Sequence, residues 1–505
     1  MLVDYHGTVV QKILQNPPSQ GALSSVTAGC VGAQAICPAY DRRQLAAGIV
    51  HLGLGAFHRA HQAVYTEQTV ASGDLRWGII GVSLRDARVP QTLAAQDCLY
   101  SVTERHGDQA RTRVVGVLRA ALHAPTQLEP VLAALGRRST AVVTITVTEK
   151  GYSQNPSSGE LDLNDAAVRH DLTQPRMPRS TLGVLAEGIR RRPSGAPLTV
   201  MCCDNMAANG DTLRTLLAQY ARETDASLAR RIESDIAFPN SMVDRIVPAA
   251  TAESLEYAAE RLGLRDAAAI VCEPFTQWVI EDRFAGPRPA WEDTGALLTG
   301  DVRPYQAMKL RLLNGAHSAI AYAGQLCGLE SVSDAMADSL VGPFVRRLML
   351  EDLCATVAPP PGYDVQAYCR DLLRRFENPA LAHRTQQIAM DGTQKVPVRW
   401  LPALRESLAA GIERPLLERA LAAWLHYLER ERSDAGNALH ISDPGAAALA
   451  ERLRQAPSPQ RAAAAALAHA PVFGAEPYPP AFAARIARHL TRLREGGMAA
   501  LLAHD

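Results

Sequence analysis

The sequence predicts an α/β protein of two domains, in which a mostly parallel sheet is followed by a mostly helical part. The chain has 505 residues, more than one hydrophobic core usually supports. Strand-like apolar runs alternate with amphipathic stretches up to about residue 295, and helical periodicity dominates from residue 296 onward. Near-continuous Val, Ile and Thr runs such as AVVTITVT at 141–148 are typical of strands buried on both faces of a parallel sheet.

The N-terminal residues 1–45 carry Pro, Gly, Ser and Ala without a clear period, so we expect an irregular arm. The first twenty residues lack a positively charged start followed by an apolar stretch, and no run in the chain approaches a membrane span. The nine scattered cysteines include no C-x-x-C pair, which favours reduced thiols. These features predict a cytoplasmic protein.

A strand, a glycine turn and a helix N-terminus are expected in GIVHLGLGAFHRAHQAVYTEQ. The apolar run from Ile49 predicts the strand, Gly53 and Gly55 predict the turn, and the helix is expected from about Phe57. Glycines let the backbone approach a phosphate closely, and unpaired amides at a helix N-terminus face the anion. His58 stands where the third glycine of G-x-G-x-x-G would be, so a tight turn that binds nothing stays open as an alternative.

Two histidines, His58 and His61, are three residues apart in this expected helix, a spacing that two metal ligands also use. No third ligand is evident in the sequence. Because the segment reads as a phosphate cradle, we expect Arg59 and the helix N-terminus to be its functional parts and predict no metal site.

Further strand-like runs follow the glycine turn, at Gly78–Leu84, Ala141–Val147, Leu198–Cys203 and Ala269–Cys272. Together with the turn they predict a Rossmann-like dinucleotide-binding domain with insertions over residues 46–295. Residues 296–505 are expected to form an α-helical substrate and catalytic domain.

The end of the second expected strand, GIIGVSLRDAR, bears on the choice of cofactor. An acidic side chain at this place accepts hydrogen bonds from the ribose 2′-hydroxyl and repels a 2′-phosphate, so Asp86 favours NAD. Arg85 and Arg88 favour a phosphate and leave NADP open. We therefore expect NAD as the main cofactor.

The stretch KLRLLNGAH places an amine, Lys309, an amide, Asn314, and an imidazole, His317, along one helical segment. At about 100° per residue, Asn314 lies roughly 140° around an α-helix from Lys309 and His317 roughly 80°, so one sector is expected to hold all three. Ketone reduction needs a proton donor for the developing alkoxide, amide hydrogens to stabilise it and a group to hold a neighbouring hydroxyl. A solvated lysine and a core histidine are the alternatives.

Seven motifs resemble, in order, those of the long-chain polyol dehydrogenase family that contains mannitol dehydrogenase and the hexuronate reductases. They cover most of residues 48 to 400 and are HLGLGAFHRAHQAVY, TVTEKGY, CDNMAANG, FPNSMVDRIVP, VCEPFTQWVIED, KLRLLNGAHS and DGTQK. The resemblance implies a Rossmann-like domain followed by a helical domain. It also implies a secondary-alcohol dehydrogenase that transfers hydride reversibly without a metal.

The resemblance also implies residue roles. Lys309 would be the catalytic acid and base, and Asn314 and Asn205 would donate amide hydrogens to the reacting oxygen. His317 would bind a substrate hydroxyl. Asp244 and Lys395 match positions that contact the polyol chain, although a capping or turn role for Asp244 stays open.

Within the family, TVTEKGY and NPALAHRTQQIAMDGTQK look like the branch that reduces keto-hexuronates, and Gln387 stands where similar mannitol-specific members carry an arginine. A buried carboxylate needs cationic donors, for which Lys150, Arg384 and Lys395 are the candidates. Each of the three is alternatively a surface cation.

A departure from the family concerns the proton. Gln306 occupies a position where relatives often carry a glutamate thought to exchange the lysine proton with solvent. An amide does not titrate, so we expect a water path or Glu149 to deliver the proton to Lys309 instead. We also place Glu149 among the cofactor-binding residues.

The formal net charge of zero removes the usual electrostatic argument for a nucleic-acid or anionic-membrane partner. We expect a small sugar acid or polyol as ligand, and a monomer or weak dimer. The expected reaction is the reduction of a keto-hexuronate, with fructuronate as the expected substrate. The alternatives are a dehydrogenase of neutral polyols, a reductase of tagaturonate and a catalytically silent sugar-acid sensor.

Overall fold

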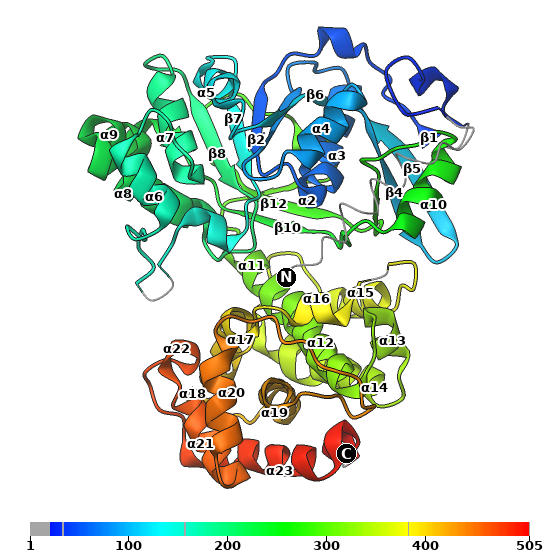
Figure 1. Cartoon of the computed structure of the whole chain (residues 1–505), viewed down its shortest axis with the longest axis vertical. Helices are drawn as coiled ribbons and strands as arrows, with labels where there is room; N and C mark the ends of the chain where they lie inside the picture. Colours follow the sequence, from blue (N-terminus) through cyan, green and yellow to red (C-terminus); the bar gives the residue numbers. More distant parts are fainter. Residues whose placement is uncertain (1–20, 33–34, 156–157, 382, 504–505) are drawn as a thin grey trace. The chain divides into compact units, whose positions relative to one another are not determined.

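The computed structural model describes residues 21–32, 35–155, 158–381 and 383–503. The chain divides into two compact units, Met1–Arg303 and Pro304–Asp505 (Figure 1). The first unit contains all the strands of the described residues, and the second is helical. The predicted fold class, a Rossmann-like domain with insertions followed by a mostly α-helical domain, is confirmed.

A six-stranded sheet forms the centre of the first unit. All its pairings are parallel. Its strands, in spatial order, are β6 (Leu118–His123), β3 (Ile79–Ser83), β2 (Ile49–Leu52), β7 (Val142–Ile145), β8 (Leu198–Cys202) and β9 (Ile236–Ala237). Counted along the chain this order is 3-2-1-4-5-6, which is that of dinucleotide-binding domains.

Both faces of this sheet are buried. Successive side chains of a strand point to opposite faces, and both sets pack into hydrophobic clusters. Val50 and Leu52 of β2 belong to one hydrophobic cluster, and Ile49 of the same strand belongs to another. The helices of the unit are α2 (Ala56–Ala60), α3 (Gln62–Ala71), α4 (Arg88–Ala95), α5 (Leu128–Gly136), α6 (Ala166–Thr173), α7 (Thr181–Arg191), α8 (Asn209–Thr224), α9 (Ala226–Asp235) and α10 (Ala252–Leu262). The near-continuous apolar runs therefore predicted strands buried on both faces correctly.

Two smaller sheets complete the first unit. One has the order β1 (Ala35–Ile36), β5 (Gln109–Val115), β4 (Tyr100–His106) and β11 (Ile270–Cys272). The other consists of β10 (Ser241–Asp244), β12 (Gln277–Glu281) and β13 (Leu297–Thr299). The run Ala269–Cys272, predicted as a strand with those of the main sheet, pairs instead with the β4–β5 hairpin, because an apolar run does not specify its partner strand.

The expected N-terminal arm lies partly outside the described residues, which exclude 1–20 and 33–34. In the described part, Leu23 is fully buried and its amide donates to the carbonyl oxygen of Arg265. This segment packs on the first unit beside Leu262 and Leu264.

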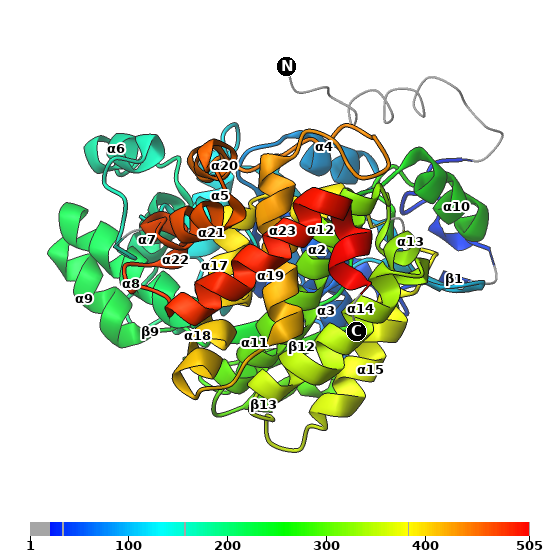
Figure 2. The ribbon, with the colours of Figure 1, turned by 90° about the horizontal axis from the view of Figure 1, so that it is seen from below.

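The second unit is a helical assembly around α19 (Pro415–Glu429), which is seen end-on among its neighbours in Figure 1 and lengthwise in Figure 2. Nearly all side chains of α19 are buried. The other helices are α11 (Arg303–Lys309), α12 (Gly315–Cys327), α13 (Val332–Ala337), α14 (Val341–Arg347), α15 (Val365–Phe376), α16 (Thr385–Ala389), α17 (Gly392–Arg399), α18 (Leu401–Ala409), α20 (Ala446–Gln455), α21 (Pro459–Leu467), α22 (Ala470–Phe473) and α23 (Pro480–Leu502). Among the described residues, no helix has the length and apolar character needed to cross a membrane.

Candidate active site

The glycine turn after β2 lies at the carboxyl edge of the central sheet, next to the end of β7. Gly53 has a φ of 101°, and a Cβ atom there would lie 2.1 Å from the carbonyl oxygen of Thr146. The Thr146 hydroxyl donates to the Gly53 carbonyl at 2.9 Å. Only glycine fits this conformation and this close approach, so Gly53 fixes the turn.

Gly55, the N-cap of α2, differs from Gly53. Its backbone angles, φ −97° and ψ −176°, suit any residue, and within the described structure a Cβ there would meet only the carbonyl oxygen of Gly53, at an ordinary 3.7 Å. The fold therefore does not require a glycine at this position. A glycine here fits the close approach of a ligand phosphate to the backbone, which is its role in dinucleotide-binding turns. Phe57 follows, half-buried and stacked on His61 at 5.0 Å.

His58 points into the unit and stacks on His51 of β2, with ring centroids 3.3 Å apart. His51 in turn makes hydrogen bonds to the hydroxyls of Thr144 and Thr146 and to the Gly53 carbonyl. Burial lowers the pKa of both imidazoles, that of His51 to about 3, so both are neutral at physiological pH. These contacts are those of a residue that supports the turn, and direct contact of His58 with a nucleotide stays a prediction.

Arg59 is also buried, and its guanidinium donates to the carbonyl oxygen of Ala268 at 2.6 Å and lies 5.4 Å from the centre of the Tyr100 ring. His61 makes a hydrogen bond to the carbonyl oxygen of Gln277. Both residues therefore connect the glycine-turn helix to neighbouring strands, and an anion contact of Arg59 stays a prediction. Over the described ranges, no group of three or more His, Cys, Asp or Glu side chains is placed to hold a metal ion.

Asp86 lies three residues beyond β3, at the same carboxyl edge. Its carboxylate forms an ion pair with Arg88 at 2.7 Å and accepts a hydrogen bond from the Arg88 amide. These bonds hold the pKa of Asp86 below its usual range, so the carboxylate is charged. Asp86, which favours NAD, and Arg88, which favours NADP, therefore form one partly exposed ion pair. Arg85, the other arginine that favours NADP, is exposed.

The loops after β7 and β8 are joined through Asp204, a residue that the sequence interpretation did not single out. Its carboxylate accepts hydrogen bonds from the amides of Val147 and Thr148 and from the hydroxyl of Tyr152. Asn205, the predicted oxyanion donor, is the next residue and is exposed. The signal that could have identified Asp204 in the sequence is a carboxylate directly after the apolar run Leu198–Cys203.

Glu149 and Lys150 lie in a short 3₁₀ helix, Glu149–Tyr152, in the loop after β7. Their backbone follows Thr148, whose φ is 67°. Their side chains lie outside the described part, so their roles in cofactor and substrate binding stay predictions.

Asp244 ends strand β10, where it pairs with Gln277 of β12, and is 3% exposed. The capping role considered for it is wrong, because it lies in a strand and not at a helix start. Burial raises the pKa of Tyr65, and the nearby charge of Asp244 adds to this. A buried carboxylate of this kind suits a substrate hydroxyl, which stays a prediction.

In the second unit, the segment with the predicted catalytic residues is not a regular α-helix. Lys309 ends α11, Leu310–Asn314 form a π-helical turn, and α12 starts at Gly315. The Gly315 amide donates to the carbonyl of Leu310, five residues earlier. This corrects the angles expected for an α-helix: the wider turn brings residues i and i+5, here Lys309 and Asn314, closer to one face. Such turns occur often at functional sites.

Lys309, Asn314 and His317 are each 6% exposed. The His317 ring packs on Phe376 at 4.5 Å and on His383 at 5.3 Å. Among the described residues, Nε2 of His317 is buried without a hydrogen-bond partner. A buried, unpaired polar atom is costly, so it is a good position for a ligand hydroxyl.

Burial lowers the pKa of His317 well below its ordinary value, and the charges of Arg399, Arg375 and Lys309 lower it further together with His383. The imidazole is therefore neutral and can both donate and accept a hydrogen bond. The cations around it favour a negatively charged ligand.

The predicted carboxylate-binding residues differ in their positions. Lys395, on α17, donates to the carbonyl oxygen of Ile388 at 3.0 Å and lies near His383. Arg384, at the start of α16, is exposed. Its neighbour His383, which the sequence interpretation passed over, is the residue that packs against His317.

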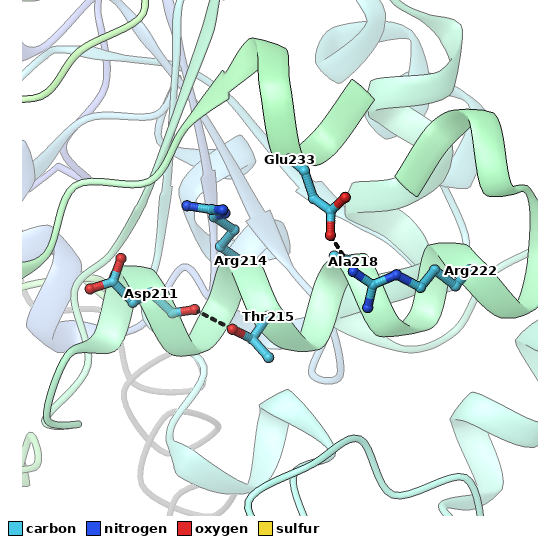
Figure 3. A pocket seen from close by; sticks show the side chains of 6 residues that line it. All are labelled: Asp211, Arg214, Thr215, Ala218, Arg222 and Glu233. Atoms are coloured by element: carbon cyan, nitrogen blue, oxygen red, sulfur yellow. Dashed lines mark hydrogen bonds and ion pairs between the residues drawn. The ribbon is translucent and has the colours of Figure 1, made fainter. Parts of the chain in front are cut away.

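A surface hollow in the first unit, between α8 and α9, contains none of these residues (Figure 3). It is lined by Asp211, Arg214, Thr215, Ala218, Arg222 and Glu233. Its Arg222 and Glu233 form an ion pair with each other. We therefore do not consider it a candidate active site.

The fold and these residues are those of a two-domain oxidoreductase with a Rossmann domain. A family model described as the mannitol dehydrogenase Rossmann domain matches residues 47–293, and one described as the mannitol dehydrogenase C-terminal domain matches residues 301–494. The chain belongs to the mannitol dehydrogenase family, which confirms the resemblance seen in the sequence.

Among the relatives, D-mannonate oxidoreductase of Escherichia coli (strain K12) is 43% identical over 81% of this chain and 85% of its own length. Mannitol 2-dehydrogenase of Cereibacter sphaeroides is 38% identical over 83% of this chain and 88% of its own. Among solved structures, mannitol 2-dehydrogenase of Pseudomonas fluorescens, in a ternary complex with NAD and D-mannitol, superimposes with a TM-score of 0.87 at 35% identity. That match covers 96% of this chain and 99% of the other.

Proposed function

We propose that this protein is an NADH-dependent reductase of a keto-hexuronate, converting D-fructuronate to D-mannonate reversibly. The observation that carries the proposal is the buried set in and next to the π-turn, Lys309, Asn314 and His317, with Nε2 of His317 unpaired in the described structure. The identity to D-mannonate oxidoreductase of Escherichia coli supports the substrate.

The proposed roles follow from the chemistry of ketone reduction. NADH, when bound, supplies the hydride that reaches the carbonyl carbon. The ammonium of Lys309 gives its proton to the oxygen, which completes the secondary alcohol and leaves a neutral amine. The side-chain amides of Asn314 and Asn205 stabilise the charge that grows on this oxygen. In the oxidative direction Lys309 takes the proton back.

His317 holds a hydroxyl next to the reacting carbon, since a neutral imidazole with an unpaired nitrogen can donate or accept. Asp244 is proposed to bind a further hydroxyl of the substrate chain. For His317, a buried polar nitrogen that is costly to leave unpaired gains a partner.

NAD is the proposed cofactor. Two observations support it: the fold does not itself require the glycine at position 55, and the carboxylate of Asp86, just after β3, is charged. The complex of the Pseudomonas fluorescens relative with NAD agrees with this assignment. The ion pair of Arg88 with Asp86 also supports NAD over NADP.

The charge distribution supports an anionic substrate. Arg375, Arg399 and Lys309 all act on His317, and each is a cation. A carboxylate enters such surroundings more readily than it enters a neutral pocket. The neutral-polyol alternative keeps support from the mannitol 2-dehydrogenases at 38% and 35% identity.

A substrate panel tests the proposal. NADH oxidation is measured with D-fructuronate, D-tagaturonate, D-fructose and D-xylulose side by side, and repeated with NADPH. We expect the highest kcat/KM with D-fructuronate and NADH. A preference for D-fructose would establish the neutral-polyol alternative, and no turnover of any substrate would favour a silent sensor.

A further inference from the structure

His383 and His317 form a pair of perpendicular imidazoles, with ring centroids 5.3 Å apart and planes at 88°. His317 lies on α12, and His383 lies just before α16, where its carbonyl oxygen accepts from the amide of Val332. The pair therefore joins two helices of the second unit.

Both members of the pair carry a buried nitrogen without a hydrogen-bond partner among the described residues: Nε2 of His317 and Nδ1 of His383. Other buried polar atoms of the described residues also lack a partner, among them both ring nitrogens of His58, so it is the proximity of these two that matters. Two of them in adjacent rings indicate a shared polar ligand, since each costs about 1–3 kcal/mol when left unpaired.

The charges that face this pair are positive. Lys309, Arg375 and Arg399 act on His317, and Lys395 acts on His383. Burial, followed by Lys395, lowers the pKa of His383 to about 4, so this imidazole is neutral at physiological pH. Arg384, the next residue, is exposed.

We propose that His383, with Lys395 beside it, binds the carboxylate end of the substrate, while His317 binds a hydroxyl. The proposal deepens the proposed function and rests on it for the identity of the substrate. In the tautomer with its proton on Nδ1, the His383 ring donates to a carboxylate oxygen, and the Lys395 ammonium balances the charge.

A dependence on pH follows. A bound carboxylate favours the imidazolium, so the pKa of His383 rises in the complex from about 4 in the free protein. Binding then takes up a proton, and affinity for the carboxylate ligand increases as the pH falls from 7 towards 5. A neutral ligand lacks this dependence.

D-mannonate and D-mannitol are matched ligands, because they differ only in carrying a carboxylate or a hydroxymethyl group at one end. The test measures KM for both with NAD, and Kd for both by calorimetry, between pH 5 and 8. The variants are His383→Leu, which removes the donor, and His383→Asn, whose amide restores a donor near Nδ1. Arg384→Leu tests the other sequence candidate for the carboxylate, Gln386→Leu is the matched control on an exposed residue nearby, and thermal unfolding checks that each variant folds.

We expect His383→Leu to raise KM and Kd for D-mannonate about tenfold or more and to leave those for D-mannitol within about twofold. His383→Asn should recover part of the loss without the pH dependence, and Gln386→Leu should behave as the wild type. Equal effects on both ligands, or a loss in Arg384→Leu in place of His383→Leu, would overturn the assignment.

The two proposals fail separately. Turnover of D-mannonate that is unchanged in His383→Leu would reject the carboxylate site and keep the proposed function. D-mannonate binding that depends on His383 without turnover would reject the proposed function and keep the site. A wild type that does not bind D-mannonate would reject the carboxylate site.

Discussion

Tyr152 donates its hydroxyl hydrogen to Oδ2 of Asp204 at 2.6 Å and thereby ties the loop after β7 to the loop after β8. The same carboxylate accepts from the amides of Val147 and Thr148. Both loops lie at the carboxyl edge of the sheet, where ligands of such folds bind. One aspartate thus positions Asn205 and the segment that contains Glu149.

Replacing Asp204 by Ala should lower kcat by about 10- to 100-fold and destabilise the protein by roughly 2 kcal/mol, since three donors lose a charged acceptor. Tyr152→Phe removes only one of the three bonds and should have a smaller effect on both. Steady-state kinetics and thermal unfolding check the order of the two variants. A Tyr152→Phe variant as impaired as Asp204→Ala would show that the amide contacts contribute little.

The two turn glycines should respond differently to substitution. Gly55→Val should raise KM for NADH about tenfold or more with little change in the unfolding temperature, because a Cβ atom there meets no protein atom closer than 3.7 Å but a side chain obstructs a phosphate. Gly53→Val should destabilise the fold strongly, because of its φ of 101° and the clash with Thr146. If Gly55→Val bound NADH normally, the turn would not be the phosphate site.

Gln306 lies three residues before Lys309 on α11 and is 6% exposed. A carboxylate here would favour the ammonium form of Lys309 and raise its pKa. Gln306→Glu should therefore shift the alkaline limb of the pH profile for ketone reduction upward by about one unit. Identical profiles for the variant and the wild type would show that position 306 does not take part in proton delivery.

Arg399 and Trp400 hold the end of the π-turn: Arg399 donates to the Asn314 carbonyl at 3.1 Å, and Trp400 donates to the Gly315 carbonyl at 3.0 Å. Arg399→Gln should lower kcat and also let the pKa of His317 rise, so that the loss of activity on acidification begins at a higher pH than in the wild type. Arg399→Lys keeps the charge and should keep the wild-type pH profile.

Trp400→Phe is the uncharged comparison, because it removes the bond to Gly315 and part of a buried ring but no charge. We expect a severalfold lower kcat without a shift in the pH profile. A shift in this variant as large as in Arg399→Gln would mean that the change reflects general loosening of the turn and not the charge.

The sequence predicted the fold class because its signals are local. Around Gly53 and Gly55, a buried strand, two glycines and a helix start follow one another at characteristic spacings. After residue 296 the helical periodicity is regular. The pairing of β11 with the β4–β5 hairpin depends on contacts between distant residues, Ile270 and Val102, which no local pattern specifies.

The candidate site was predicted where it consists of motif residues, such as Lys309, Asn314 and His317. The π-turn was missed because five polar and apolar residues, LRLLN, fit an α-helix equally well, and the extra residue is stabilised by distant donors such as Arg399. His383 was missed because burial and an unpaired nitrogen are tertiary properties, whereas the charge of Arg384 is visible in the sequence.

The most direct test of the central claim, that Lys309 protonates a keto-hexuronate, compares the wild type with Lys309→Ala in the oxidation of NADH by D-fructuronate. We expect a loss of kcat of about 10²- to 10⁴-fold with little change in the Kd for NADH, as for removal of a general acid. Turnover of D-fructuronate by Lys309→Ala within about threefold of the wild type would contradict the account.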